Sequence, residues 1–131
     1  ADDLVQDWAA ATAAALPEVE RRGSHDGNPA WYVRGKMFVW DRPLRASDLA
    51  HLGPEAPTGP IVGVRVADEG AKRALVASQP DYCFTTPHFD GYAAVLVQLD
   101  HVPVDELVEL IEESWLLRAP KRLAADWLAT R

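Results

Sequence analysis

The strands that the first third of the sequence predicts lie so close together that only hairpins can join them. Val19–Arg22, Trp31–Arg34 and Met37–Trp40 have the pattern of β-strands. Ser24–Pro29 is a dense turn sequence between the first two, and Gly35-Lys36 predicts a tight hairpin or a bulge before the third. Connections this short join antiparallel strands, because a parallel pair needs a crossover of a dozen or more residues. We therefore expect an antiparallel sheet.

Periodicity, proline and helix caps predict the other elements. Before the strands we expect a first helix, capped by Asp2 or Asp3 and ended near Leu16 by Pro17. After them we expect a short helix Ser47–Leu52, a stiff loop Pro54–Pro60 and a strand Ile61–Val66 with its valines facing inward. Three helices complete the chain: one from Asp68 to about Gln79 with Ala71, Leu75 and Ala74 on its buried side, an amphipathic one that begins at Pro103-Val104 and carries Leu107, Leu110, Ile111, Ser114 and Trp115 on one face, and a last one at Lys121–Thr130.

The stretch Cys83–Asp100 combines a restricted polar turn with a well-marked strand. Its turn contains Thr85, Thr86, Pro87, His88 and Gly91, and its strand places Val95, Val97 and Leu99 on one face by the period of two. A rigid loop that leads into a strand is a common way to hold functional side chains in place. The loop Thr85–Tyr92 is therefore a candidate ligand or interaction site, with Thr85, Thr86, His88 and Tyr92 as its residues.

Hairpin connections without a regular βαβ alternation predict an α+β fold, in which helices cover an antiparallel sheet in two layers. With 131 residues, of which 48% are hydrophobic and 25% charged, residues 1–131 are expected to form a single domain with a true core. At least three of the five tryptophans are expected to pack in the core or at its edge, and Trp31 and Tyr32 are expected to face opposite sides of one strand.

The composition predicts a cytoplasmic protein. No apolar run approaches the roughly 20 residues of a membrane span, and the N-terminal residues lack the pattern of a signal peptide. A single cysteine excludes an internal disulfide and a four-cysteine metal site. We expect no membrane partner and no cofactor.

Two groups of basic residues give the strongest indication of binding. A net charge of −7 opposes non-specific binding to nucleic acid, but local potential decides where an anion docks. Basic residues near the tip of a hairpin have the physical form of a wing that touches a DNA backbone, although ordinary solubilising charge explains the same residues. The candidate DNA-binding residues are Arg34, Lys36, Arg42, Arg45, Arg118, Lys121 and Arg122. This hypothesis requires the two groups to share one face.

Catalysis has little support. Cys83 and His88 are the one pair that resembles a nucleophile and its base, but a buried cysteine and a hydrogen-bonded loop histidine explain them better. His88 with Asp90, and His25 with Asp26, could ligate a divalent metal only if their loops met, and turn-forming aspartates and surface histidines explain the same residues. The chain lacks a P-loop, a dinucleotide fingerprint, a zincin motif and a nucleophile elbow. We expect a protein that is not an enzyme and holds no metal.

Four segments, taken together in order and spacing, resemble the MmcQ/YjbR family over nearly the whole chain. They are Ala15–Glu20, Pro29–Trp40, Phe84–Tyr92 and Ser114–Leu123. The resemblance implies a compact α+β fold of the kind described as CyaY-like or double wing, whose members are commonly labelled DNA-binding proteins. It brings no agreed catalytic residues, and the relation of this fold to frataxin does not imply iron binding, since no matching motif is present.

The leading hypothesis is therefore a non-enzymatic binding protein of the MmcQ/YjbR type that contacts DNA through the basic residues. The alternative is a protein-interaction or small-ligand module that uses the Thr85–Tyr92 loop without nucleic acid. A concave pocket lined by this loop, with no continuous positive surface nearby, would favour the alternative.

Overall fold

The structure is a computed structural model that describes residues 9–24 and 27–131. A helical stretch at residues 9–14 comes first. The strands are β1 (Val19–Gly23), β2 (Pro29–Val33), β3 (Lys36–Asp41), β4 (Ile61–Arg65), β5 (Cys83–Phe84) and β6 (Ala94–Gln98). The helices are α2 (Ala46–Leu52), α3 (Glu69–Ser78), α4 (Val104–Arg118) and α5 (Lys121–Ala129), with the one-turn 3-10 helices η1 (Gly53–Glu55) and η2 (Pro87–Phe89).

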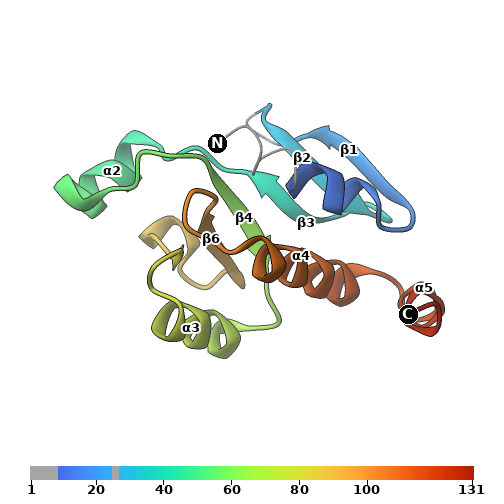
Figure 1. Cartoon of the computed structure of the whole chain (residues 1–131). Helices are drawn as coiled ribbons and strands as arrows, with labels where there is room; N and C mark the ends of the chain where they lie inside the picture. Colours follow the sequence, from blue (N-terminus) through green and yellow to red (C-terminus); the bar gives the residue numbers. More distant parts are fainter. Residues whose placement is uncertain (1–8, 25–26) are drawn as a thin grey trace.

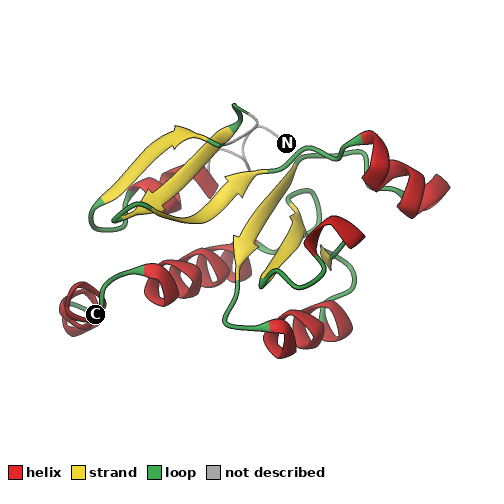
Figure 2. Cartoon of the chain, turned by 180° about the vertical axis from the view of Figure 1, so that it is seen from behind, coloured by secondary structure: helices red, strands yellow, loops and turns green. Residues whose placement is uncertain are grey.

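The described strands form one antiparallel sheet with its main helices on one side (Figure 1). The strand order is β1-β2-β3-β4-β6-β5, and every neighbouring pair is antiparallel. Figure 2 shows α3 and α4 below the sheet, while α2 and α5 lie at opposite ends of the molecule. The predicted α+β class, an antiparallel sheet covered by helices, is confirmed.

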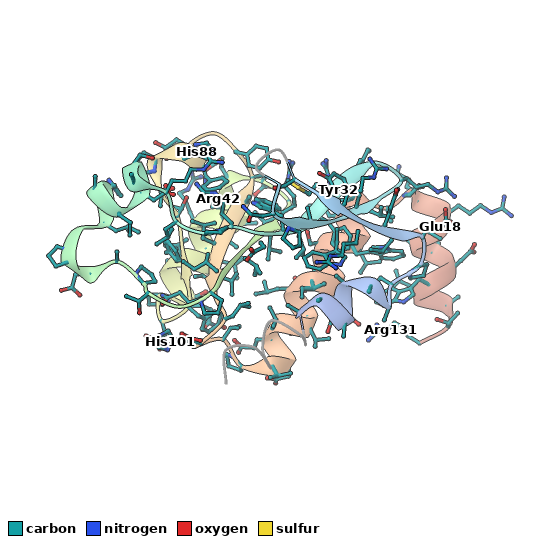
Figure 3. All side chains as sticks on the ribbon, turned by 90° about the horizontal axis from the view of Figure 1, so that it is seen from above. Glu18, Tyr32, Arg42, His88, His101 and Arg131 are labelled. Carbon is teal, nitrogen blue, oxygen red and sulfur yellow. The ribbon has the colours of Figure 1, made fainter. Side chains whose placement is uncertain are left out.

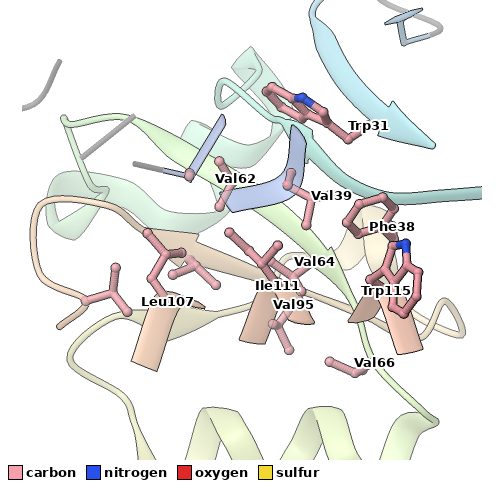
Figure 4. Close-up of a cluster of buried hydrophobic side chains, with 14 of the residues drawn as sticks. Trp31, Phe38, Val39, Val62, Val64, Val66, Val95, Leu107, Ile111 and Trp115 are labelled. Atoms are coloured by element: carbon pink, nitrogen blue, oxygen red, sulfur yellow. The ribbon is translucent and has the colours of Figure 1, made fainter. Parts of the chain in front are cut away.

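The larger core lies between the sheet and α4 (Figure 4). Leu107, Ile111 and Trp115 of α4 are fully buried there against the inward valines of β4 and β6. Each such side chain stabilises the fold by about 1.5–3 kcal/mol relative to an exposed one. Val95, Val97 and Leu99 all enter this core, as the period-two pattern predicts.

A bulge in β3 adds Phe38 to this core. Trp31 of β2 faces Val39, whereas the next residue, Tyr32, faces Met37, so Phe38 is the extra residue. Phe38 and Val39 therefore both point toward α4. The Ser114 hydroxyl donates a hydrogen bond of 2.8 Å to the Phe38 carbonyl, which fixes the helix beneath the bulge.

The hairpin between β2 and β3 turns one residue earlier than predicted. Val33 pairs with Lys36, and the turn residues Arg34 and Gly35 have φ values of +49° and +80°. Two successive positive φ angles are those of a type I′ turn, which matches the twist of the flanking strands. The predicted Gly35-Lys36 turn is thus shifted to Arg34-Gly35, and the bulge lies at Phe38.

The other predicted elements are present with small shifts at their ends. Asp68 caps α3 by accepting the N–H of Ala71 at 2.8 Å, as expected. Ala74 is exposed instead of buried, and the two-residue strand β5 was not predicted. Trp31, Trp40 and Trp115 are buried, which confirms the packing role expected for three tryptophans. The expected caps Asp2 and Asp3, together with Trp8, His25 and Asp26, lie outside the described residues.

Candidate functional site

The candidate site lies on the sheet face opposite α3 and α4. A smaller apolar cluster covers this face, built from Ala30, Trp40, Ile61, Phe89, Ala94 and Leu96. Beside it the surface is hollowed by a pocket of about 260 Å³. The pocket is lined by Ser24, Met37, Trp40, Arg42, Arg45, His88, Phe89 and Tyr92. Residues from β3 and from the Thr85–Tyr92 loop therefore meet at one depression.

Three aromatic rings form the wall of this hollow. The ring centroids of Trp40, Phe89 and Tyr92 lie 6.2–6.5 Å apart in all three pairings. His88 meets the Phe89 ring edge to face at 4.8 Å. Separations of this size are typical of favourable aromatic contacts. Tyr92 is the exposed ring of this wall and can pack against a flat ligand, whereas Trp40 and Phe89 are each only 5% exposed and pack against Tyr92.

Gly63 makes room for Trp40 against the sheet. Gly63 pairs with Trp40 across β3 and β4, and a Cβ atom at this position would lie 2.3 Å from the indole ring. The ring therefore lies directly over the β4 backbone, where only glycine leaves enough space. A glycine between the β-branched residues Val62 and Val64 was the sequence signal for such a close approach.

A buried lysine from the other side of the molecule holds the loop in place. The Lys72 ammonium group on α3 donates to the carbonyl oxygens of Phe89 at 2.5 Å and Tyr92 at 3.0 Å, and approaches Glu69 at 3.4 Å. Its side chain is 4% exposed, so these carbonyls replace the water that a buried ammonium needs. Lys72 was missed by the sequence reasoning, since a lysine on a helix normally faces solvent.

A buried ion pair forms the floor of the hollow. The Arg42 guanidinium donates to Asp48 Oδ2 at 2.9 Å and also to the carbonyl oxygen of Pro43, and its carbon lies 5.2 Å from the Phe89 ring centroid. Both charged side chains are almost inaccessible, at 4% and 2% exposure. The backbone N–H of Arg45 donates to the same carboxylate oxygen at 2.9 Å, which ties the start of α2 to the pair.

The environment of Asp48 favours its ionised form. Burial raises the pKa of this carboxyl, but the hydrogen bonds from the Arg45 N–H and from Arg42 outweigh burial, so its pKa lies below the ordinary value. The Thr86 hydroxyl is close enough to lower this pKa further, although its geometry is outside that of a regular hydrogen bond. Asp48 therefore stays charged and compensates Arg42.

The structure separates the basic residues that the sequence grouped together. Arg42 and Arg45 line the hollow, and Arg42 is buried in its ion pair. Arg34 lies at the hairpin tip, where it forms an ion pair with Glu18 that lowers the pKa of this carboxyl. Figure 3 shows Glu18 at the end of the molecule opposite Arg42 and His88. Lys36, Lys121 and Arg122 are exposed, whereas Arg118 is half-buried.

The four loop residues have different environments. His88 and Tyr92 are exposed and line the hollow. Thr86 is 1% exposed, which is a correction to its expected role as a contact residue, because a buried hydroxyl beside Asp48 cannot reach a ligand at the surface. Thr85 is half-buried and its hydroxyl makes only a long hydrogen bond of 3.4 Å to the Thr86 carbonyl.

Cys83 and His88 do not form a nucleophile and base. Cys83 pairs with Val97 and points into the core beneath the sheet, where burial raises the pKa of its thiol to about 11. His88 lines the hollow on the opposite face. Within residues 9–24 and 27–131, no three His, Cys, Asp or Glu side chains are grouped so that they could hold a metal ion.

Comparison with known proteins assigns the chain to a family. The YjbR family model matches residues 14–117. The chain is 52% identical over 117 residues to uncharacterized protein Mb2600 of Mycobacterium bovis and to uncharacterized protein Rv2570 of Mycobacterium tuberculosis (strain H37Rv), and the match covers 87% of this chain and 88% of each relative. This chain therefore belongs to the YjbR family, which confirms the resemblance found in its motifs.

A solved structure has the same fold. Deinococcus radiodurans protein DR2400, a DUF419 domain protein, superposes with a TM-score of 0.60 over 82% of this chain and 72% of that chain, at 20% sequence identity. At this identity the likeness concerns the fold alone. In the described part of this chain, no helix combines the length and apolar character of a membrane span.

Proposed function

We propose that the protein is a non-enzymatic binding protein whose ligand is a small planar molecule held in the aromatic hollow. The observation that carries the proposal is the convergence of Trp40, Phe89 and Tyr92 around a pocket on the sheet face that α3 and α4 leave uncovered. Ligand sites of this kind combine an apolar, aromatic lining with a few polar groups.

The size and lining of the hollow define the ligand class. A volume of about 260 Å³ lies at the small end of ligand pockets, so it suits a molecule of one or two rings. Tyr92 offers an exposed ring for stacking, Trp40 is 5% exposed and supports that ring through its edge contact, and Ser24 and His88 offer hydrogen bonds at the rim. The Arg42–Asp48 pair and Lys72 hold the floor and the loop rigid, which lowers the entropic cost of binding.

Binding of planar and non-planar probes tests this proposal. We would titrate the full chain with 2-naphthol, indole and cyclohexanol and follow the signals of the pocket residues by NMR. We expect 2-naphthol and indole to bind and cyclohexanol not to bind, because stacking requires a flat ring. Equal binding of cyclohexanol, or planar probes that leave the pocket signals unchanged, would contradict it.

A matched pair of histidine variants locates the site. His88→Gln at the hollow should weaken 2-naphthol severalfold, whereas His101→Gln should have no effect, since His101 is also exposed but lies on the other side of the molecule (Figure 3). Trp40→Leu, which keeps an apolar side chain over Gly63, should weaken the probe about tenfold, a loss of about 1.4 kcal/mol. An unchanged affinity in both His88→Gln and Trp40→Leu would overturn the assignment of this site.

DNA binding remains a second candidate, supported by the position of the hairpin tip. The Arg34-Gly35 turn projects at the same end of the molecule as α5, which carries exposed Lys121 and Arg122 (Figure 1). Such a wing beside a basic helix start can contact a phosphate backbone. Glu18 offsets part of this charge through its ion pair with Arg34, so we expect only weak, strongly salt-dependent binding.

A low-salt titration tests this second candidate. Duplex and single-stranded DNA would be added to the wild type and to the triple variant Lys36→Gln, Lys121→Gln, Arg122→Gln. The hypothesis requires binding by the wild type that falls with added salt and is lost in the triple variant. No binding at low salt, or binding that the triple variant retains, would reject this role.

A further inference from the structure

Two arginines at the lower end of the sheet lie together without a counter-ion among residues 9–24 and 27–131. Arg65 ends β4, and Arg118 ends α4. Neither side chain makes a hydrogen bond or an ion pair with any residue of the described chain, and the Nε atom of each is buried and unpartnered. Buried polar groups are normally hydrogen-bonded, so two unpaired guanidinium donors in one place call for an explanation.

The fold itself brings the two arginines together. The Ser114–Phe38 hydrogen bond fixes α4 beneath the β3 bulge, and Arg118 follows one helical turn after Ser114. Phe38 adjoins Arg65 across the β3–β4 pairing, since Val39 pairs with Val64. Burial and the positive charge of Arg65 both lower the pKa of Arg118, as expected for two neighbouring like charges.

The third member of this group is Tyr92. The Arg65 guanidinium carbon lies 4.4 Å from the centroid of the Tyr92 ring, within the range of a cation–π contact. This contact holds the Arg65 side chain in one orientation but supplies no negative charge. Arg65 is therefore held in place, and the positive charges of both arginines remain uncompensated within the described residues.

An apolar cleft opens beside Arg65, which lines it, while Arg118 is not one of its lining residues. A cavity of about 560 Å³ between α3 and α4 is lined by Arg65, Glu113 and Ser114 together with Val66, Ala67, Ala71, Ala74, Leu75, Leu110, Leu116 and Leu117. Nearly all of these side chains are apolar. Glu113 makes no ion pair with either arginine, and burial and Glu109 raise the pKa of its carboxyl. The cleft thus joins an apolar trough to a site of positive charge.

We propose that Arg65 and Arg118 form a binding site for the anionic head of a small amphipathic molecule, whose apolar part lies in the cleft between α3 and α4. A phosphate or carboxylate head accepts hydrogen bonds from both guanidinium groups, which bind such oxygen pairs in a fixed planar geometry. The head supplies the negative charge that the two arginines lack. This site is separate from the aromatic hollow, although Tyr92 borders both.

Three probes that share parts of this chemistry test the proposal by isothermal titration calorimetry on the full chain. Octyl phosphate carries head and chain, inorganic phosphate carries the head alone, and octyl glucoside carries the chain with a neutral head. We expect octyl phosphate to bind at least tenfold more tightly than either of the other two. Equal affinity of octyl phosphate and octyl glucoside would exclude an anion site, and equal affinity of octyl phosphate and inorganic phosphate would exclude the cleft.

Substitution of one arginine gives two independent readouts. Arg118→Gln should weaken octyl phosphate about tenfold or more, whereas Arg122→Gln, an exposed arginine one helix further, should change it less than twofold. Arg118→Gln should also leave the ligand-free protein at least as stable as the wild type, because it removes one of two repelling charges. Unchanged affinity, or a clear loss of stability without ligand, would overturn the proposal.

The test also separates this site from the proposed function. Trp40→Leu weakens 2-naphthol in the aromatic hollow but should leave octyl phosphate binding unchanged. If Trp40→Leu reduced both ligands equally, the two sites would be one, and the assignment to Arg65 and Arg118 would fail.

Discussion

Arg42 and Asp48 form an ion pair that is almost completely removed from water, with 2.9 Å between Nη2 and Oδ2. The pair connects the end of β3 to the start of α2, and the Arg42 guanidinium also contacts the Phe89 ring. One interaction therefore links three segments at the floor of the candidate site. A surface role for Arg42 in DNA binding is no longer expected, since Asp48 neutralises its charge inside the protein.

Asp48→Ala should strongly destabilise the fold. The substitution leaves the Arg42 charge buried and unpaired, a change that typically costs about 3–5 kcal/mol. Urea unfolding would measure this loss. The double variant Arg42→Met, Asp48→Leu should recover most of the lost stability, because two apolar side chains need no counter-ion. Glu18→Ala should have only a small effect on stability, since the ion pair of Glu18 with Arg34 is exposed. A loss in the double variant as large as in Asp48→Ala would show that charge is not the cause.

The same pair should make stability depend on acid. Because the pKa of folded Asp48 lies below its ordinary value of 3.8, its contribution is complete above that pH and disappears as the pH falls through the folded value. The stability difference between wild type and Asp48→Asn should therefore shrink below about pH 4. Asp41→Asn is the control: its stability difference from the wild type should change with pH in the opposite direction, because burial raises the pKa of Asp41. A difference that stays constant from pH 6 to pH 3 would contradict this.

Ser114→Ala should cost about 1–3 kcal/mol, the usual cost of leaving a buried carbonyl without its partner. The Ser114 hydroxyl is the group that satisfies the Phe38 carbonyl at the bulge, at 2.8 Å. Denaturant unfolding checks this, and Ser78→Ala at the exposed end of α3 serves as the control. If both variants lost equally little stability, the hydrogen bond from Ser114 would not be important for anchoring α4.

Gly63→Ala should displace Trp40 from its position over β4. The new methyl group would lie 2.3 Å from the indole ring, a distance that forces the ring or the backbone to move. We expect a loss of at least 1–3 kcal/mol, as for overpacked cores, together with altered Trp40 signals and weaker binding of planar probes. The control is Gly70→Ala on α3, a glycine away from the site. Gly27→Ala is not suitable as a control, because the φ angle of Gly27 is positive. Unchanged Trp40 signals would contradict the predicted close packing.

Cys83 should be unreactive in the folded protein. Its thiol is buried, and its pKa of about 11 keeps it protonated at neutral pH, whereas the reactive form is the thiolate. Modification by a disulfide reagent at pH 8 should be slow in buffer and fast in denaturant. Rapid modification of the folded chain would reopen the possibility of chemistry at Cys83.

Local patterns in the sequence predicted the class of fold and most of its elements. The alternation of Val95, Val97 and Leu99, the Asp68 cap and the short strand connections are all properties of neighbouring residues, and the structure confirms each. The motifs were also specific enough to indicate the YjbR family. Errors were confined to a turn displaced by one residue, the exposed Ala74 and the short strand β5.

The candidate site was predicted only in part. The structure places His88 and Tyr92 of the Thr85–Tyr92 loop at a pocket, but its partner Trp40 and the buried anchor Lys72 were not identified from the sequence. Lys72 is 17 residues from Phe89, and no spacing rule connects a helical lysine to a loop carbonyl at that distance.

Residue order and side-chain chemistry thus determine the strands, the helices and the family of this protein, because these depend on periodicity and on contacts close in the chain. The tertiary structure decided which partner each charged side chain has and whether it is buried. Arg42 is neutralised inside the protein by Asp48, Arg34 is paired at the hairpin tip, and Arg65 and Arg118 meet without a counter-ion in the part of the chain that the structure describes. The physical reason is that a charge interacts with whatever the fold brings within a few ångströms, and its neighbours in the sequence do not reveal those partners.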